Sequence, residues 1–110
     1  MEMKEMSEIV DKWVRKYTVG YWKPNNQVLR LMEEVGELAR EVNHKFGQKP
    51  RKSGEDVREI SYELGDILFT TICIANGLDI DLEEAFKHIM EKYDTRDRDR
   101  YEKSLKNKEN

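Results

Sequence analysis

The chain has 110 residues, a formal net charge of −3 and 39% charged residues. This length is typical of one domain with a modest core, and the slightly acidic charge balance argues against nucleic-acid binding. Cys73 is the only cysteine, so the chain cannot form an internal disulfide, and a reducing compartment is expected. No stretch resembles a signal peptide or a membrane span, which favours a cytoplasmic protein.

The first half of the chain predicts two amphipathic helices. Apolar residues recur at three- and four-residue steps near the N-terminus, which predicts a helix over residues 3–18. A stretch containing Gly20 and Pro24 interrupts the pattern, and a second helix is expected over residues 26–46. Its apolar residues fall on one side of the helix. The acidic residues that fall together on the other side are Glu33, Glu34 and Glu37.

A third, largely apolar helix is predicted over residues 54–76. Ser53 with Asp56 resembles a capping box at its start, and Gly77 is a typical end signal. Its apolar residues cover more than half of the circumference, which is typical of a buried helix.

A fourth helix should begin after Asp81, which forms a second capping pattern with Glu84. After Asp94 the chain has little apolar content, so we expect a frayed helix and then a disordered tail. These boundaries suggest a domain over residues 1–94 and a charged tail over residues 95–110. With no convincing strand pattern, the predicted fold class is all-α.

Two carboxylates lie within the apolar third helix. Glu63 and Asp66 begin a narrow stripe that continues through Thr70, Cys73 and Gly77 at steps of three and four residues. A buried carboxylate must become protonated or find a partner. One explanation is pairing with lysine or arginine from elsewhere, such as the basic connector over residues 45–52. The other is a cation shared with the acidic side of the second helix.

The residue types indicate which cation would be shared. Five carboxylates without a partner histidine or cysteine select hard cations such as Mg²⁺ or Mn²⁺. A di-iron centre is disfavoured because His44 and His88 do not occur in Glu-x-x-His pairs, and both histidines are expected at the surface. For the acidic side of the second helix alone, a solvated face remains the ordinary alternative.

Two motifs carry a resemblance to a known family. "EEVGE" at Glu33–Glu37 followed by "ELGD" at Glu63–Asp66 resembles the signature of the MazG-like all-α nucleoside triphosphate pyrophosphohydrolases. The wider stretch from Tyr21 to Arg100 is similar to the short, single-domain YpjD-like branch of that family. Either motif alone would be a weak indication, whereas the pair is fairly specific.

This resemblance implies an enzyme that hydrolyses (d)NTPs to the monophosphate and pyrophosphate with Mg²⁺, with house-cleaning of non-canonical nucleotides as one role. It implies that one glutamate of the second helix, among Glu33, Glu34 and Glu37, orients or deprotonates the attacking water. It also implies a homodimer or a dimer of dimers. The metal ligands that it implies are Glu33, Glu34, Glu37, Glu63 and Asp66.

Substrate contacts are predicted at four further positions. Lys92 and Arg96 stand one turn apart and could neutralise phosphates, although an exposed helix end explains them equally well. Asn76 could read a base or sugar edge, or simply cap its helix. Trp22 could stack on a base, or lie in a core or interface.

Two other functions remain open. One is phosphoribosyl-ATP pyrophosphohydrolase, which shares the fold. The other is a non-catalytic interaction or nucleotide-sensing module with a structural cation. Because the third helix is apolar on most sides, we also expect self-association with Ile72 or Ile74 at or near the interface.

Overall fold

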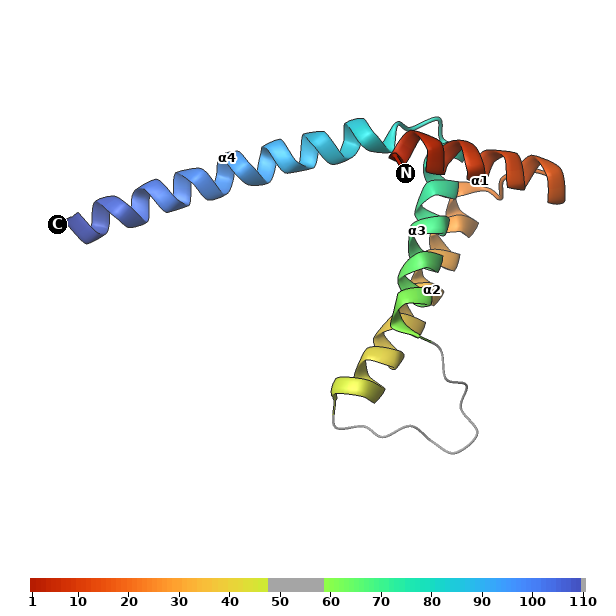
Figure 1. The fold of residues 1–110 in the computed structure, drawn as a ribbon, viewed down its shortest axis with the longest axis horizontal. Helices are drawn as coiled ribbons and strands as arrows, with labels where there is room; N and C mark the ends of the chain where they lie inside the picture. The colour runs from red at the N-terminus through yellow and green to blue at the C-terminus, as the bar shows by residue number, and fades with distance from the viewer. Residues whose placement is uncertain (48–58, 110) are drawn as a thin grey trace. The chain divides into compact units, whose positions relative to one another are not determined.

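The computed structural model describes residues 1–47 and 59–109 and contains four α-helices in that part of the chain. They are α1 (Met3–Tyr17), α2 (Pro24–Phe46), α3 (Ile60–Gly77) and α4 (Leu82–Glu109) (Figure 1). The described residues include no strand, so the all-α prediction is confirmed. The predicted capping pair Ser53 and Asp56, and the expected start of the third helix, lie outside the described residues.

The chain divides into two compact units, residues 1–80 and 81–110. The first unit contains α1, α2 and α3, and the second contains α4. Within the described residues, no helix is long and apolar enough to cross a membrane.

The first unit has a small apolar core where α1 and α3 are in contact. It lies on one face of α1, because its residues there are four positions apart. The Trp13 ring extends this contact by meeting the Phe69 ring edge-on, with centroids 5.6 Å apart. The buried apolar residues are Val10, Val14, Ile72, Cys73 and Ala75.

A hydrogen-bonded turn ends α1 and leads the chain into α2. The backbone N–H and the hydroxyl group of Thr18 both donate to the carbonyl oxygen of Val14, at 3.0 and 2.7 Å. Gly20 follows with φ of 122°, a backbone conformation that side-chain-bearing residues rarely adopt. Pro24 then starts α2 at a position where its missing N–H costs nothing.

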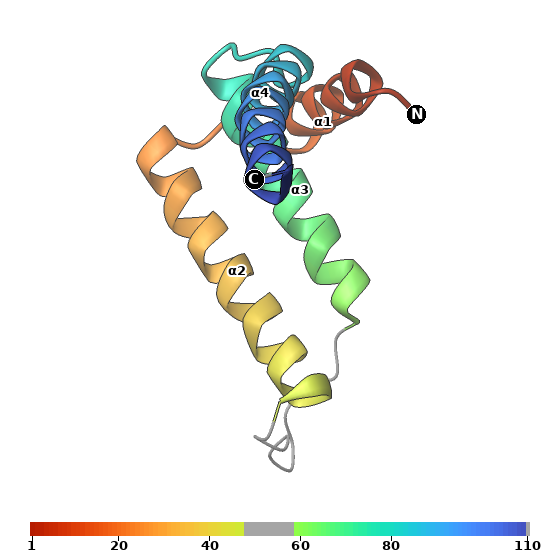
Figure 2. The same cartoon turned by 90° about the vertical axis from the view of Figure 1, so that its left-hand side faces the viewer.

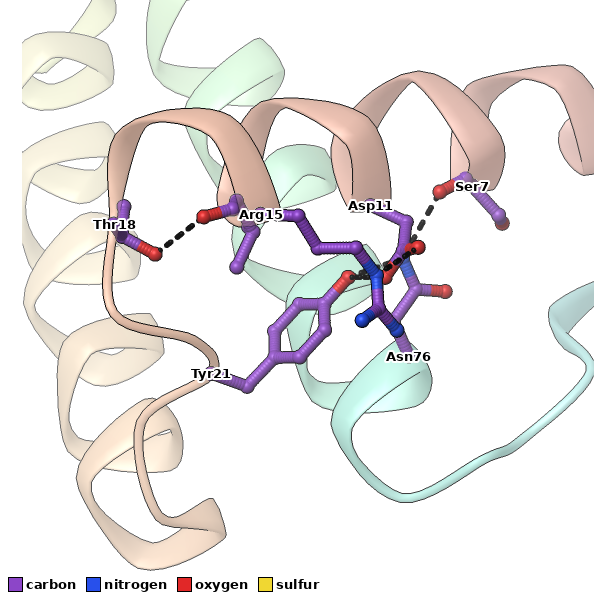
Figure 3. A network of polar contacts seen from close by, with 7 residues as sticks. Ser7, Asp11, Arg15, Thr18, Tyr21 and Asn76 are labelled. Atoms are coloured by element: carbon purple, nitrogen blue, oxygen red, sulfur yellow. Dashed lines mark hydrogen bonds and ion pairs between the residues drawn. The ribbon is translucent and has the colours of Figure 1, made fainter.

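A polar network fastens this turn to the end of α3 (Figure 3). The Tyr21 hydroxyl donates to Asp11 on α1 at 2.7 Å, and Arg15 donates to the other carboxylate oxygen of Asp11, also at 2.7 Å. The Asn76 side-chain amide donates to the Tyr21 hydroxyl and to the Ser7 carbonyl, both at 3.0 Å. Three segments of the first unit are therefore joined by direct hydrogen bonds.

Helices α2 and α3 run antiparallel and side by side (Figure 2), and they are in contact. The side of α2 that is buried is polar: its buried residues are Gln27, Glu34 and Glu41. Its apolar side is open, with Val28, Met32 and Val35 exposed by 46%, 66% and 48%. The most buried positions of α2 are thus polar, while the apolar Leu31, Leu38 and Val42 are only half-buried, unlike the usual amphipathic helix.

The stripe predicted on α3 faces inward, since Glu63, Thr70 and Cys73 are buried and Asp66 is half-buried. Ile72 is buried inside its own chain at 2% exposure and Ile74 is half-buried, and a place for either at or near an interface stays a prediction. Ile72 is the neighbour of Cys73 in the inward-facing stripe, so its side chain also turns toward the interior, where α3 meets α1. The large hydrophobic side chains that α3 exposes are Tyr62, Leu64, Leu68 and Phe69.

The end of α3 differs in detail from the sequence prediction. The helix includes Gly77, and the left-handed residue that follows is Asp79, with φ of 58°. Gly77 lies against Tyr21 instead: a Cβ at this glycine would stand 3.5 Å from the Cβ atom of Tyr21. This is an ordinary van der Waals distance, so Gly77 packs beside the polar network without forming the left-handed turn.

The second unit is a single helix, α4, which begins as predicted. The Asp81 carboxylate accepts hydrogen bonds from the backbone N–H groups of Glu83 and Glu84, at 3.0 and 3.2 Å. The helix then continues to Glu109, and the expected division at residue 94 between a domain and a charged tail stays a prediction. Residues 95–109 are rich in helix-favouring Arg, Glu, Lys and Leu, and local ion pairs such as Arg100–Asp97 add a little support.

Candidate active site

Three carboxylates from two helices meet between α2 and α3. Glu34 and Glu37 come from one face of α2, since residues three apart are neighbours on a helix surface. Glu63 comes from the inward stripe of α3. One oxygen from each lies within 4.8 Å of the other two. The two sequence motifs "EEVGE" and "ELGD" thus converge in space.

The cluster is shielded from water to an unusual degree for acidic groups. Glu63 has no exposed surface, Glu34 is 3% exposed and Glu37 is half-buried. Removing ionised carboxylates from water is costly, and like charges this close repel each other. Groups arranged in this way are typical of sites that hold a cation or take part in chemistry.

The donor set fits a hard divalent cation. Carboxylate oxygens are the ligands that Mg²⁺ prefers, at 2.0–2.1 Å, so two oxygens on opposite sides of one ion stand about 4.2 Å apart. Neighbouring oxygens around the same ion stand about 2.9 Å apart, so the cluster oxygens, within 4.8 Å of one another, would need to draw together by up to about 2 Å.

The other two predicted ligands, Asp66 and Glu33, have different surroundings. Asp66 is half-buried, one turn after Glu63, and lines a cavity together with Glu34. Glu33 points away: its side chain is 67% exposed and stands 3.6 Å from the Arg30 guanidinium. The structure therefore separates neighbours that the sequence motif could not distinguish.

Sequence reasoning missed Arg30, which lies against the acidic side of α2. Its guanidinium forms an ion pair with Glu34 at 2.9 Å, and its side chain is 52% exposed. The signal was present in the sequence, because Arg30 precedes Glu34 by four residues and Glu33 by three.

Glu41 and His44 continue the inward face of α2 beyond the cluster. Glu41 is only 3% exposed, and His44 is half-buried rather than fully at the surface as predicted. Glu41 follows Glu34 by seven residues, which is two helical turns, so the spacing could have indicated its burial. His44 is half-buried because it follows Glu37 by the same two turns.

A cavity of about 360 Å³ adjoins the acidic cluster. It lies where α1, the turn after it, α2 and α3 come together. Its aromatic lining residues are Trp13, Tyr21, Trp22 and Phe69. Its charged and amide lining residues are Gln27, Arg30, Glu34 and Asp66. A flat aromatic group attached to an anionic chain suits such a combination of surfaces.

The predicted substrate contacts have different surroundings. Trp22 is 59% exposed and lines this cavity, so the structure brings it beside Glu34 and Asp66. Asn76 lies at the end of α3, where its amide group donates to Ser7 and Tyr21. These contacts tie it to the polar network.

The two cations predicted to contact phosphates lie on α4, in the other compact unit. Lys92 is exposed. Arg96 pairs with Asp97 at 3.0 Å and lies over the Tyr93 ring, 4.8 Å from its centroid. A role for either residue in substrate binding stays a prediction.

The pKa shifts of Tyr21, Asp11 and Cys73 indicate structural roles for these groups rather than nucleophilic ones. Burial and the hydrogen bond to Asp11 raise the pKa of Tyr21 to about 12, so its hydroxyl remains protonated and can donate. Hydrogen bonds from Arg15 and Tyr21 lower the pKa of Asp11. Burial raises the pKa of the Cys73 thiol, which makes this free cysteine a poor nucleophile, as expected of a core residue.

The fold and the site define the class: an all-α protein whose carboxylates meet between two antiparallel helices. The family of MazG nucleotide pyrophosphohydrolase domains matches residues 23–101. The chain therefore belongs to this family and is a nucleotide pyrophosphohydrolase.

Individual relatives agree with this membership. The chain is 48% identical over 99 residues to YpjD of Bacillus subtilis (strain 168), covering 90% of this chain and 89% of YpjD. A crystal structure of B. subtilis YpjD, described as a candidate pyrophosphatase, has a TM-score of 0.76 at 46% identity, covering 84% of this chain and 95% of that one. A Bacillus MazG protein described as a nucleotide pyrophosphohydrolase has a TM-score of 0.73 at 45% identity, covering 84% and 90%.

Proposed function

We propose that the enzyme hydrolyses nucleoside triphosphates between the α- and β-phosphates in a Mg²⁺-dependent reaction. The observation that carries this proposal is the convergence of Glu34, Glu37 and Glu63 beside an aromatic cavity. Carboxylates repel a triphosphate, so their concentration at a nucleotide site makes sense when they hold divalent cations. Bound Mg²⁺ would neutralise phosphate charge and lower the pKa of a coordinated water; Mn²⁺ should substitute.

Each acidic residue then has a proposed role. Glu34 and Glu63, the buried members, hold the metal, and Asp66 completes the set from the cavity side. Glu37 is half-buried, so it borders both the cluster and solvent. We assign to Glu37 the orientation of the attacking water. Glu33 remains a predicted ligand that would need to rotate inward to contribute.

The cavity suits the nucleoside part of the substrate. Trp22 and Trp13 offer aromatic faces on which a base could stack, and Gln27 offers an amide that can read a base edge. Because Glu34 and Asp66 line the same cavity, a base held there would place its phosphates beside the carboxylates. The non-canonical nucleotides of a house-cleaning enzyme would enter the same space.

The decisive assay is pyrophosphate release from a panel of (d)NTPs with and without Mg²⁺. We expect monophosphate and pyrophosphate as products, with activity lost in EDTA and restored by Mg²⁺ or Mn²⁺. Orthophosphate as the product would contradict cleavage at the α-phosphorus. Metal binding without turnover of any nucleotide would favour the sensing module, and selective turnover of phosphoribosyl-ATP would favour the narrower enzyme.

We further propose that the protein is a homodimer, with a dimer of dimers as the larger alternative. The open apolar side of α2 is the support: Val28, Met32 and Val35 form one stripe, and α3 adds Leu64 and Leu68. Exposed apolar side chains gathered in this way are unusual on a monomer, and pairing with a second copy would bury them. Light scattering at micromolar concentration tests this, and Met32→Lys should lower the mass to that of a monomer. A monomeric wild type would contradict it.

The compartment is also a proposal. The single buried thiol of Cys73 is compatible with a reducing environment, and we expect the enzyme in the cytoplasm, where nucleotides are abundant.

A further inference from the structure

We propose that Arg30 is a substrate-binding residue that exchanges its carboxylate partners for a phosphate oxygen of the triphosphate. In the structure its two terminal nitrogens face Glu33 and Glu34, at 3.6 and 2.9 Å. This inference rests on the proposed function, because it names a residue that would bind the anionic part of that substrate.

The position of Arg30 is the first argument. It lines the aromatic cavity together with Glu34 and Asp66, and it also lines a second, shallower hollow with Glu33 and Trp22. Among the described residues that line these two spaces, Arg30 is the sole lysine or arginine. It therefore stands between the aromatic surface suited to a base and the carboxylates suited to a metal.

Charge is the second argument. A triphosphate carries several negative charges, and the two spaces that Arg30 lines also present the carboxylates of Glu33, Glu34 and Asp66. A fixed cation reduces this repulsion, and the planar guanidinium can give two parallel hydrogen bonds to a phosphate group. No other residue of the two linings can do so.

Exposure makes the exchange feasible. The Arg30 side chain is 52% exposed, so it keeps contact with solvent and can reorient within the cavity mouth. Its partner Glu34 is 4% exposed at the side chain, so this carboxylate stays in place when Arg30 leaves. A metal ion bound by Glu34 would weaken the ion pair, because the carboxylate charge would then be shared. Metal binding should thus release Arg30 for the incoming phosphate.

If Arg30 exchanges its partners in this way, Arg30→Gln should weaken binding of the phosphate chain without weakening binding of the metal. Loss of a charged donor should weaken binding of Mn²⁺-tripolyphosphate, a probe without base or sugar, by about 10-fold to 100-fold. Binding of Mn²⁺ alone should be unchanged or tighter, because a competing positive charge beside Glu34 has gone. Arg30→Lys keeps the charge without the planar pair of donors, so its tripolyphosphate affinity should fall between those of the wild type and Arg30→Gln.

Calorimetric titrations of the full chain measure both affinities. Arg40→Gln is the matched control, since it removes the same charge from an exposed position of α2 outside both linings. It should change the tripolyphosphate affinity by less than twofold. An unchanged affinity in Arg30→Gln, absent binding by the wild type, or an equal effect in Arg40→Gln would overturn the proposal.

A parallel loss of Mn²⁺ affinity in Arg30→Gln would also overturn it, because Arg30 would then act by positioning Glu34. Failure of the proposed function looks different. In that case the wild type releases no pyrophosphate from any nucleotide, whatever the titrations show.

Discussion

Two polar regions of residues 1–80 are built on opposite principles. In the network around Tyr21, donors and acceptors alternate: Asn76 donates to Tyr21, and Tyr21 and Arg15 donate to Asp11. In the cluster between α2 and α3, three carboxylates of the same charge approach each other. The first arrangement favours the folded state, whereas in the second like charges repel one another, with the Arg30 guanidinium paired to Glu34 at its edge.

The two regions differ in how their charges affect the stability of the folded state, and this difference indicates that one is structural and the other functional. A complementary network holds the α1–α2 turn against α3 without needing a ligand. A cluster of like charges is retained against its cost because it performs chemistry, and such groups often occur at active sites. Substitutions should therefore have opposite consequences for stability and activity in the two regions.

The largest expected effect comes from the centre of the cluster. Glu63→Gln keeps the side-chain size and removes the charge, so pyrophosphate release should fall by at least about 100-fold, in the range typical for removal of an essential catalytic group. Without metal, the variant should be at least as stable as the wild type, because repulsion with Glu34 and Glu37 is relieved. A nucleotide hydrolysis assay and thermal melts in EDTA measure the two effects.

Glu59→Gln is the control for this substitution, because Glu59 is exposed one turn earlier at the start of α3. It should retain near wild-type activity. Near-normal turnover by Glu63→Gln would remove the cluster from the active site.

The second effect is metal-linked stability. A cation that binds the folded state alone stabilises it by about 2.7 kcal/mol at a hundredfold excess over its Kd. The melting temperature should therefore rise with Mg²⁺ or Mn²⁺ in the wild type, and this rise should vanish in Glu34→Gln. Differential scanning fluorimetry gives the measurement, and Tyr21→Phe should keep the full rise. An absent shift in the wild type at millimolar metal would contradict a working cation site.

A smaller effect is expected in the complementary network. Tyr21→Phe removes the hydroxyl that joins Asp11 to Asn76, and it should lower the free energy of unfolding by about 1–2 kcal/mol. Urea denaturation measures the change, with Tyr17→Phe as a control because Tyr17 is 63% exposed. The metal-induced stabilisation should not change. Equal stability of the two variants would show that the network contributes little.

The smallest effect is a dependence of stability on alkaline pH. The pKa of Tyr21 is about 12 in the folded protein, against about 10 in an unfolded chain. Between these values the unfolded chain releases a proton that the folded protein retains, so the stabilising contribution is complete below pH 10 and is lost as the pH rises toward 12. Unfolding curves at pH 9 to 11 should therefore converge for the wild type and Tyr21→Phe. A constant difference between them would contradict the raised pKa.

Much of the fold follows from local pattern. Three- and four-residue apolar spacing is enough to define α1 and most of α2, and the Asp81 cap marks the start of α4. Helix α4 runs on to Glu109 beyond Asp94, where low apolar content favoured fraying and then disorder, because these residues have good helix propensity. The motifs containing Glu34 and Glu63 also indicated the family, since their residue types and spacing are visible in the chain itself.

The sequence by itself determined the helical class, the family and the helix faces that carry carboxylates, because these depend on residue type and periodicity along one segment. The tertiary structure alone decided which face of α2 meets α3, and hence that Glu34 lies in the cluster while Glu33 faces outward toward Arg30. It also decided that Asn76 joins a network with Tyr21 and Ser7. These outcomes depend on distances between segments far apart in the chain, which helical periodicity does not contain.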